Sequence, residues 1–424
     1  MKTINQHSLP GPDDITRAIL PNGITVLART NFNSPSVVIG GYLPCGSLFD
    51  TDEKLGLADF TASSLLRGSE KRDFQGIFDD LESAGANLSF SAGGHTAGFT
   101  GRCLSEDLSL LLDVLADALR RPIFPGEQLE RLRAQFLTGL SIRAQDTAEM
   151  AALTFDQIVF EGHPYARPDD GWPETIQAIT REDLADFHRL HYGPQGLVIA
   201  IVGAVDPKAI GGQVAKVMGE WANPSQPELP TLPELKPIKK TITRKIKIPG
   251  KSQADLVIGT SGPRRKDPEF MPASLGNSVL GQFGMAGRIG QVVREKSGLA
   301  YYASSSLSAG VGPGAWDVSA GVNPGNVQKA RNLICQEIAR FVEKGVTEEE
   351  LADSQSNFIG RLPLSLESNA GVVNALLNIE RFDLGLDYYR RYPDLVRAVT
   401  PATVLATARK YLHPEKLAIA ISGS

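Results

Sequence analysis

Cysteine is scarce in this sequence: 424 residues contain three, Cys45, Cys103 and Cys335, far apart and without a C-x-x-C pair. This pattern excludes a disulfide framework and a thiolate metal site, and it favours a reducing compartment. Long hydrophobic runs are also missing, because the longest, "LVIAIVGAV" from Leu197, has about half the length that a bilayer crossing needs. The N-terminal stretch lacks the apolar core of a secretory signal. We therefore expect a cytoplasmic protein that does not enter a membrane.

Blocks of like charge are absent as well. The net charge is −5, and no run of five residues carries one sign. Nucleic-acid binding proteins usually show a strong basic excess or a basic tract. We therefore expect no nucleic-acid partner.

Proline, by contrast, is concentrated in one place. Five prolines fall between residues 224 and 237, at a spacing that blocks helix and central strand and favours extended chain. We interpret residues 222–242 as a linker between an N-terminal domain, 1–221, and a C-terminal domain, 243–424, each long enough for its own core.

The two domains repeat one another. Residues 179–203 align with residues 399–423 at an offset of 220 without a gap, and eight positions are identical. Each copy reads as a threonine-capped helix (Thr180, Thr400), a proline-containing turn and a buried strand. Earlier, "SVVIGGYLPCGS" at Ser36 echoes "DLVIGTSGPRRK" at Asp255 at an offset of 219. Strands clustered between helices, without strict alternation, predict an α+β fold of two homologous domains, each a sheet covered by helices on one face.

The helix expected after Gly56, "GLADFTASSLLRGSE", has one unusual face. Asp59, Ala62, Ser63 and Leu66 fall on a single stripe at helical spacing. The stripe is neither apolar, as a core face would be, nor clearly catalytic.

Four segments, in order, resemble the pitrilysin family of zinc peptidases, which includes insulysin and the mitochondrial processing peptidases. They are "LPNGITVLA" at Leu20, "GSLFDTDEKLGLADF" at Gly46, "FEGHPYARP" at Phe160 and "GRIGQVVREKSGLAYYASSSL" at Gly287. The likeness covers almost the whole chain. It implies that the two domains form one half of a clamshell.

The resemblance also implies a lost metal site. Active members carry His-x-x-Glu-His on the helix described above, where two histidines bind zinc and the glutamate acts as general base. This sequence has Asp59, Ala62 and Ser63 at the three positions. Gly139 and Leu140 stand where the third ligand, a glutamate, is expected. The resemblance therefore predicts no cofactor in this chain.

A second functional pair of the family is kept. Its arginine and tyrosine, which hold the substrate carbonyl and stabilise the oxyanion, match Arg294 and Tyr301 in "REKSGLAY". We expect Arg294 in the last turn of a helix that ends at Gly298, and Tyr301 at the start of a strand. The chain thus resembles the non-zinc subunit of a bacterial heterodimeric member. The implied partner is a homologous subunit with His-x-x-Glu-His and zinc, and the implied substrate is a peptide or an unfolded protein.

Several alternatives stay open. Gly281, Gly284 and Gly287 either contact substrate or only lead into the helix; no Lys-Ser/Thr follows them, which disfavours a phosphate loop. His95, expected in the hairpin that faces the former zinc site, could pair with Asp59. His188 and His191 lie three residues apart, as metal ligands can, although the repeated copy has no histidines there. The whole chain could also be a catalytically silent scaffold or a peptide-binding homologue.

Overall fold

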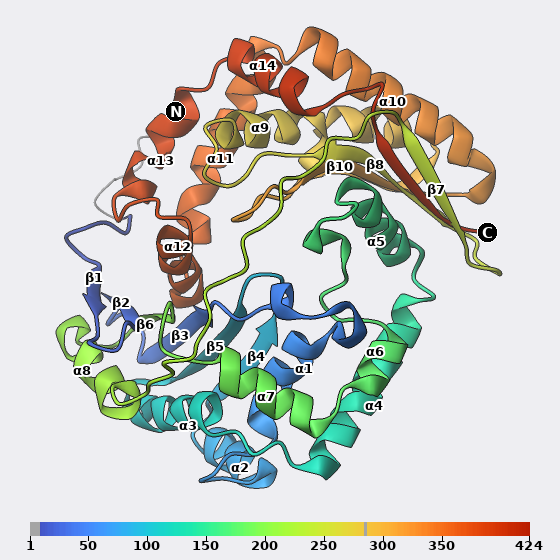
Figure 1. Cartoon of the computed structure of the whole chain (residues 1–424). Helices are drawn as coiled ribbons and strands as arrows, with labels where there is room; N and C mark the ends of the chain where they lie inside the picture. Colours follow the sequence, from blue (N-terminus) through green and yellow to red (C-terminus); the bar gives the residue numbers. More distant parts are fainter. Residues whose placement is uncertain (1–8, 284–285) are drawn as a thin grey trace.

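The computed structural model describes residues 9–283 and 286–424, and it builds each half of the chain on one β-sheet (Figure 1). The first sheet has the strand order β1-β2-β6-β3-β5-β4 and the second β7-β11-β8-β10-β9. The strands are β1 (Thr16–Ile19), β2 (Thr25–Thr30), β3 (Ser36–Leu43), β4 (Asn87–Ala92), β5 (Ala97–Leu104), β6 (Val198–Gly203), β7 (Ile242–Lys247), β8 (Ala254–Ser261), β9 (Ala300–Leu307), β10 (Ala315–Val322) and β11 (Ala418–Gly423).

The two sheets share one topology. Without β1, strands β2-β6-β3-β5-β4 correspond in order to β7-β11-β8-β10-β9, and in each sheet the first of these pairs is parallel while the others are antiparallel. The repeated apolar segments form β6 and β11, which are buried along their whole length, as central strands require. The predicted fold of two homologous α+β domains is confirmed.

For the similar segments that begin at Ser36 and Asp255, the strand pairing gives a different residue offset from the one in the sequence alignment. Ile39 pairs with Ile201 in the first sheet, and Leu256 pairs with Ile421 in the second. Because Ile421 follows Ile201 by 220 residues, Ile39 corresponds to Leu256, an offset of 217 rather than the predicted 219. A shift of two keeps every side chain on its face, which explains why the pattern alone could not detect it.

The helices cover the sheets in layers. In the first half they are α1 (Leu57–Ser64), α2 (Phe74–Ser83), α3 (Leu108–Arg120), α4 (Gly126–Arg143), α5 (Thr147–Val159), α6 (Pro173–Ala178), α7 (Arg181–His191) and α8 (Pro207–Met218). In the second half they are α9 (Phe270–Asn277), α10 (Val327–Lys344), α11 (Glu348–Ser365), α12 (Asn369–Arg381), α13 (Tyr388–Arg397) and α14 (Pro401–Tyr411). As predicted, α7 and α14 begin at Thr180 and Thr400, whose hydroxyls accept a hydrogen bond from the backbone N–H three residues later.

One helix from each half packs on the sheet of the other half. Helix α12 lies on the open face of the first sheet, where Leu376 joins the core formed with Leu27 and Ala200 (Figure 1). Helix α5 does the same for the second sheet, where Phe155 packs with Val257. Helices of the same half cover one face of each sheet, as predicted; the other face is covered from the opposite half.

The four sheet edges differ in charge. The edge strand β7 carries Arg244, Lys245 and Lys247, and the edge strand β1 carries Arg17, which pairs with Glu380 of α12. Such charges discourage the addition of a further strand. The opposite edges, β4 ("NLSFSA") and β9 ("AYYASSSL"), carry no charged residue. These two edges are therefore the ones suited to an added strand.

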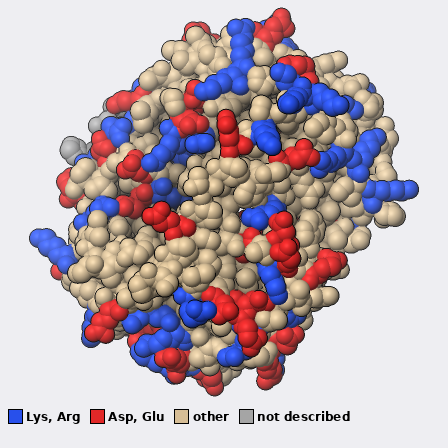
Figure 2. All heavy atoms as spheres, in the orientation of Figure 1, with Lys and Arg blue, Asp and Glu red and all other residues tan. Residues whose placement is uncertain are grey.

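The surface and the connecting chain agree with the composition. Figure 2 shows acidic and basic side chains interspersed over the face in view. Between α8 and β7 the chain forms neither helix nor strand, and Asn223 fixes its start by donating to the carbonyls of Arg189, Leu190 and Tyr192. None of the described helices is both long and apolar enough to span a bilayer.

Candidate functional site

The helix with the unusual face, α1, begins under a buried carboxylate. Asp50 accepts hydrogen bonds from the backbone N–H groups of Gly56 (2.9 Å) and Ala58 (3.0 Å), so its side chain caps the helix. Burial raises the pKa of Asp50 to about 7. Gly56 has φ +91°, a left-handed conformation that glycine adopts without strain.

The stripe of α1 faces the edge strand β4 and helix α4. Asp59 is partly buried, and its Oδ1 accepts from the backbone N–H of Ala92, the last residue of β4, at 3.1 Å. Burial raises the pKa of Asp59 to about 6, and the nearby charges of Asp170 and Asp169 act in the same direction. Ala62 is fully buried.

Helix α4 supplies the remaining predicted positions. The rings of Phe60 and Phe136 lie 5.2 Å apart and hold α4 against α1. Gly139 is exposed, whereas Leu140 is buried in the core. Around Asp59, the side chains at the expected ligand positions are thus a hydroxyl at Ser63 and an alkyl group at Leu140.

This donor set does not fit a catalytic zinc ion. Such a site needs three nitrogen, sulfur or carboxylate ligands from the protein, and only one of the three positions offers one. In the part of the chain that the structure describes, no three His, Cys, Asp or Glu side chains come together as a metal site requires. The mismatch lies in the residue types at these three positions.

Tyr301 lies on the second sheet's uncharged edge strand, β9, and Arg294 lies in the helical segment that precedes it. Arg294 is in the last turn of a π-helical segment (Gly290–Glu295), and Gly298, with φ +61°, donates its N–H to the Arg294 carbonyl (2.8 Å) before β9 begins. Tyr301 is the second residue of β9 and is 61% exposed. The Arg294 side chain is 43% exposed, with Glu295 as its ion-pair contact at 3.9 Å. The local geometry follows the prediction, and both side chains are accessible to a ligand.

The two predicted centres lie at equivalent sheet edges. Strand β4, beside Asp59, corresponds to β9, which carries Tyr301, in the shared topology. They belong to opposite halves, and within residues 9–283 and 286–424 no hydrogen bond or ion pair joins Arg294 or Tyr301 to Asp59 or Ser63. Among the described residues, the two centres therefore have no direct polar contact.

A buried hydrogen-bond network next to Tyr301 was not predicted from the sequence. The carboxylate of Asp255, which is 1% exposed, accepts hydrogen bonds from the hydroxyl of Tyr302 (2.6 Å), from Thr147 of α5 and from the amide of Gln253. Through Asp255, this network connects β9 to helix α5 of the first half. Nothing local in the sequence marks these partners, because Thr147 and Asp255 are 108 residues apart.

The glycines before the helix are packed rather than open. Gly281 and Gly287 are both buried, and a Cβ built on Gly287 would lie 2.3 Å from the Cα of Gly281. Gly284 lies outside the described residues. Contact of the three with substrate stays a prediction, while the close approach gives an independent reason for glycine.

Replacing Gly287 by alanine should lower the free energy of unfolding by about 1 to 3 kcal/mol, because the added methyl group meets backbone that must move. Urea denaturation measures this change. The control is Gly139→Ala in α4, where no atom beyond the adjoining residues and the helix's own backbone lies within 4 Å of the added methyl group. It should be neutral or stabilising by up to about 1 kcal/mol. Equal stability of both variants would contradict the packing argument.

A cleft of about 460 Å³ lies between the halves, under the loop that joins β9 to β10. His95 lines it, and its Nε2 lies 2.5 Å from the hydroxyl of Tyr165. The proposed pair of His95 with Asp59 is therefore not formed, since Asp59 faces β4. Likewise, His188 Nε2 contacts the Leu119 carbonyl (2.9 Å) and His191 packs on Phe187, so both have structural roles.

Asp156 of α5 also lines this cleft. Burial raises its pKa to about 7, and the charges of Asp317 and Asp169 raise it further. Between the usual aspartate pKa of 3.8 and about 7, the folded protein therefore holds a proton that the unfolded chain has released, and the stability that this proton provides is lost as the pH rises across this range.

Asp156→Asn should consequently gain stability relative to the unmodified protein as the pH rises from 5 to 8. The expected change is on the order of 1 to 3 kcal/mol, because asparagine does not ionise. Urea denaturation at both pH values tests it. A difference that does not vary with pH would show that Asp156 is ionised throughout.

Comparison with known proteins gives matches to one family over both halves of the chain. Two models of peptidase family M16 match it: the insulinase (peptidase family M16) model over residues 25–165 and the peptidase M16 inactive domain over residues 178–358. A protein described as an uncharacterised zinc protease of Streptomyces coelicolor is 27% identical over 409 residues, which cover 95% of this chain and 88% of the relative. A probable mitochondrial-processing peptidase subunit beta of Arabidopsis thaliana is 23% identical over 99% of this chain and 80% of its own length.

Solved structures agree with these matches. A peptidase M16 inactive domain from Pseudomonas fluorescens superposes with a TM-score of 0.90 at 26% identity, covering 97% of this chain and 98% of its own. A protease from Helicobacter pylori reaches a TM-score of 0.89 over 98% and 100% of the two chains. At 17% identity, this second similarity shows the fold alone.

Proposed function

Because this chain belongs to peptidase family M16, the insulinase family, we propose that it is the non-zinc subunit of a heterodimeric zinc endopeptidase. Its partner would be a homologous chain with an intact His-x-x-Glu-His motif. The proposal rests on the difference between two sets of positions in this chain, those of the zinc ligands and those of the arginine and tyrosine. The ligand positions hold Ser63 and Leu140, while Arg294 and Tyr301 are kept and exposed.

The roles of the two exposed side chains follow from their chemistry. The guanidinium of Arg294 is permanently charged and presents several N–H donors in one plane, and the phenol of Tyr301 adds an O–H donor. Aimed at a scissile carbonyl, they hold the substrate and stabilise the negative charge that forms on its oxygen. This chain supplies no base for water, so the metal and the base would come from the partner.

The uncharged edges support a peptide substrate. An extended peptide binds to an exposed edge by backbone hydrogen bonds, as an additional strand. The edge of β9 begins beside Tyr301, and the corresponding edge of the partner would lie beside its zinc site. We place this reaction in the cytoplasm, since all three cysteines are free.

Mixing tests the proposal. This chain is combined with a His-x-x-Glu-His homologue encoded in the same genome, and cleavage of an internally quenched peptide is followed. We expect activity in the mixture and none from this chain alone. Hydrolysis by the isolated chain, abolished by a chelator, would overturn the assignment of Asp59, Ala62 and Ser63.

A peptide-binding homologue without hydrolysis is the second candidate, which the two uncharged edges also favour. Light scattering would then show self-association and no complex with the zinc-bearing homologue. Peptide binding without cleavage in the mixture would decide for this function.

A further inference from the structure

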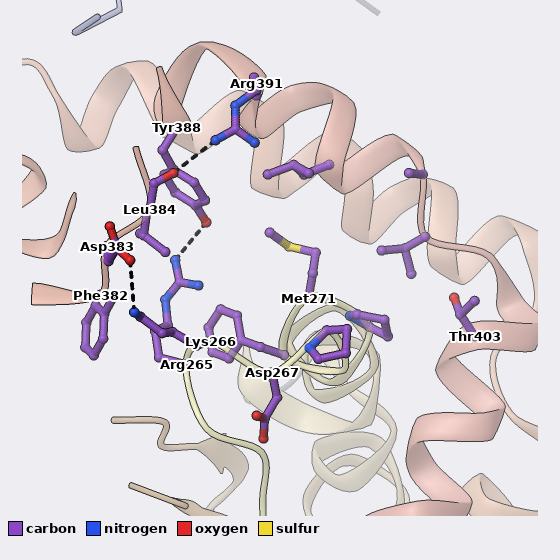
Figure 3. A pocket seen from close by; sticks show the side chains of 16 residues that line it. Arg265, Lys266, Asp267, Met271, Phe382, Asp383, Leu384, Tyr388, Arg391 and Thr403 are labelled. Carbon is purple, nitrogen blue, oxygen red and sulfur yellow. Dashed lines mark hydrogen bonds and ion pairs between the residues drawn. The ribbon is translucent and has the colours of Figure 1, made fainter. Parts of the chain in front are cut away.

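A cavity of about 630 Å³ opens between the start of α9 and the helices α13 and α14 (Figure 3). None of the residues predicted for catalysis or substrate binding lines it. Its walls are largely apolar, with Phe270, Met271, Leu384 and Leu395 among them. Small-molecule sites typically have this size and this kind of lining, with a few polar groups that orient the ligand.

Arg265 is one of the charged residues that line this cavity, and its side chain is held in place. Its Nη2 donates to the hydroxyl of Tyr388 at 2.7 Å, and its guanidinium carbon lies 4.2 Å from the ring centroid of Phe270 and 5.3 Å from that of Tyr388. Figure 3 shows Arg265 directed toward Tyr388, with Met271 extending into the open space beside them. Stacking and the hydrogen bond fix the side chain before any ligand arrives.

The other charged residues of the lining already have partners. Lys266 pairs with Asp383 (3.3 Å) and Arg391 with Asp387 (2.7 Å), while Asp267 accepts the backbone N–H of Arg264 (2.8 Å). Within residues 9–283 and 286–424, Arg265 has no carboxylate within ion-pair distance. It is thus the one lining cation, in the described part of the chain, whose charge is not matched by an acid.

We propose that this cavity binds a small ligand with a carboxylate on an apolar body, the carboxylate being held by Arg265. The planar guanidinium presents five N–H donors, of which Tyr388 uses one, so a carboxylate can receive two parallel hydrogen bonds. The apolar walls enclose the rest of the ligand. Two sources share this chemistry: a medium-chain fatty acid and the free C-terminus of a short peptide that ends in an apolar residue.

Calorimetric titration of the purified full-length chain tests the proposal with both sources. The probes are octanoate and N-acetyl-leucyl-phenylalanine, and the matched neutral probes are octanamide and N-acetyl-leucyl-phenylalanine amide. We expect at least one acid to bind in the micromolar to millimolar range, about 10-fold or more tightly than its amide. Binding of only one acid identifies the source. The site is independent of the proposed peptidase role, so binding does not require the partner subunit.

Two variants locate the binding. Arg265→Gln should weaken the acid by about 10- to 100-fold, because it removes the charge-assisted bonds. The neighbouring exposed Arg264→Gln, outside the lining, should bind as the unmodified chain does. If Arg265→Gln loses its cooperative thermal transition, Ala398→Trp replaces it: Ala398 is an exposed lining residue, and the larger side chain is designed to reduce the space for a ligand while Arg265 is unchanged.

Each of the following outcomes would overturn the proposal: failure of both acids to bind at millimolar concentration, equal affinity of acid and amide, or unchanged binding in Arg265→Gln or, where that variant does not fold, in Ala398→Trp. An unchanged affinity in Ala398→Trp with a weakened Arg265→Gln would place the carboxylate on Arg265 from outside this cavity, which also contradicts it.

Discussion

Replacing Tyr301 by phenylalanine should lower the kcat of the mixed subunits by about 100- to 1,000-fold. The variant lacks only the hydroxyl, which we assign to the developing oxyanion. Because this bond strengthens in the transition state, kcat should fall far more than KM rises. Steady-state kinetics with an internally quenched peptide measures both. Arg294→Ala should lose at least as much, since it removes a charge as well as donors.

Matched controls separate chemistry from folding. Tyr302→Phe changes the adjacent tyrosine, whose hydroxyl donates to Asp255 instead of facing solvent, and Lys296→Ala removes an exposed cation two residues from Arg294. Both should keep kcat within about threefold. Loss of activity in Tyr302→Phe but not in Tyr301→Phe would show that the neighbouring phenol acts on substrate, and the assignment from the family motif would be wrong.

Leu376→Ala should destabilise the folded chain by about 2 to 5 kcal/mol. Leu376 of α12 is fully buried between the second half and the first sheet, so its removal leaves a cavity where the two halves meet. Urea denaturation followed by tryptophan fluorescence gives the free energy of unfolding. We also expect one transition in both proteins, because the shared helices couple the two sheets.

Leu364→Ala is the control for this substitution. It makes the same chemical change on α11, at a side chain that is 69% exposed, and should cost less than about 0.5 kcal/mol. If the two substitutions lowered the free energy of unfolding equally, or if Leu376→Ala unfolded in two separate steps, helix α12 would not join the halves as the structure indicates.

Local patterns in the sequence predicted local structure well. The caps at Thr180 and Thr400, the left-handed Gly298 and the buried strands β6 and β11 all depend on interactions within a few residues. The placement of Arg294 in the last helical turn and of Tyr301 at the start of β9 followed from the same kind of signal.

Contacts between residues that are far apart in the sequence could not be predicted, because nothing local in the sequence marks the partner. Helix α5 has an ordinary apolar face, and nothing in it says that the complementary surface is Val257 on the other half's sheet. The hydrogen bond between His95 and Tyr165 joins residues 70 apart, so the sequence alone left His95 free to pair with Asp59. The pocket at Arg265 depends likewise on Tyr388, which lies 123 residues further along the chain.

The exchange of α5 and α12 bears on how the two similar halves of this polypeptide can vary. Each copy now completes the hydrophobic interior of its sibling, so neither can be lost, swapped for a foreign module or allowed to diverge freely at those surfaces. A substitution at one of these shared core surfaces requires a compatible residue on the facing surface of the other half. Asp59 and Ser63 on α1 lie outside these two shared cores, so substitutions at those positions leave the packing between the halves intact.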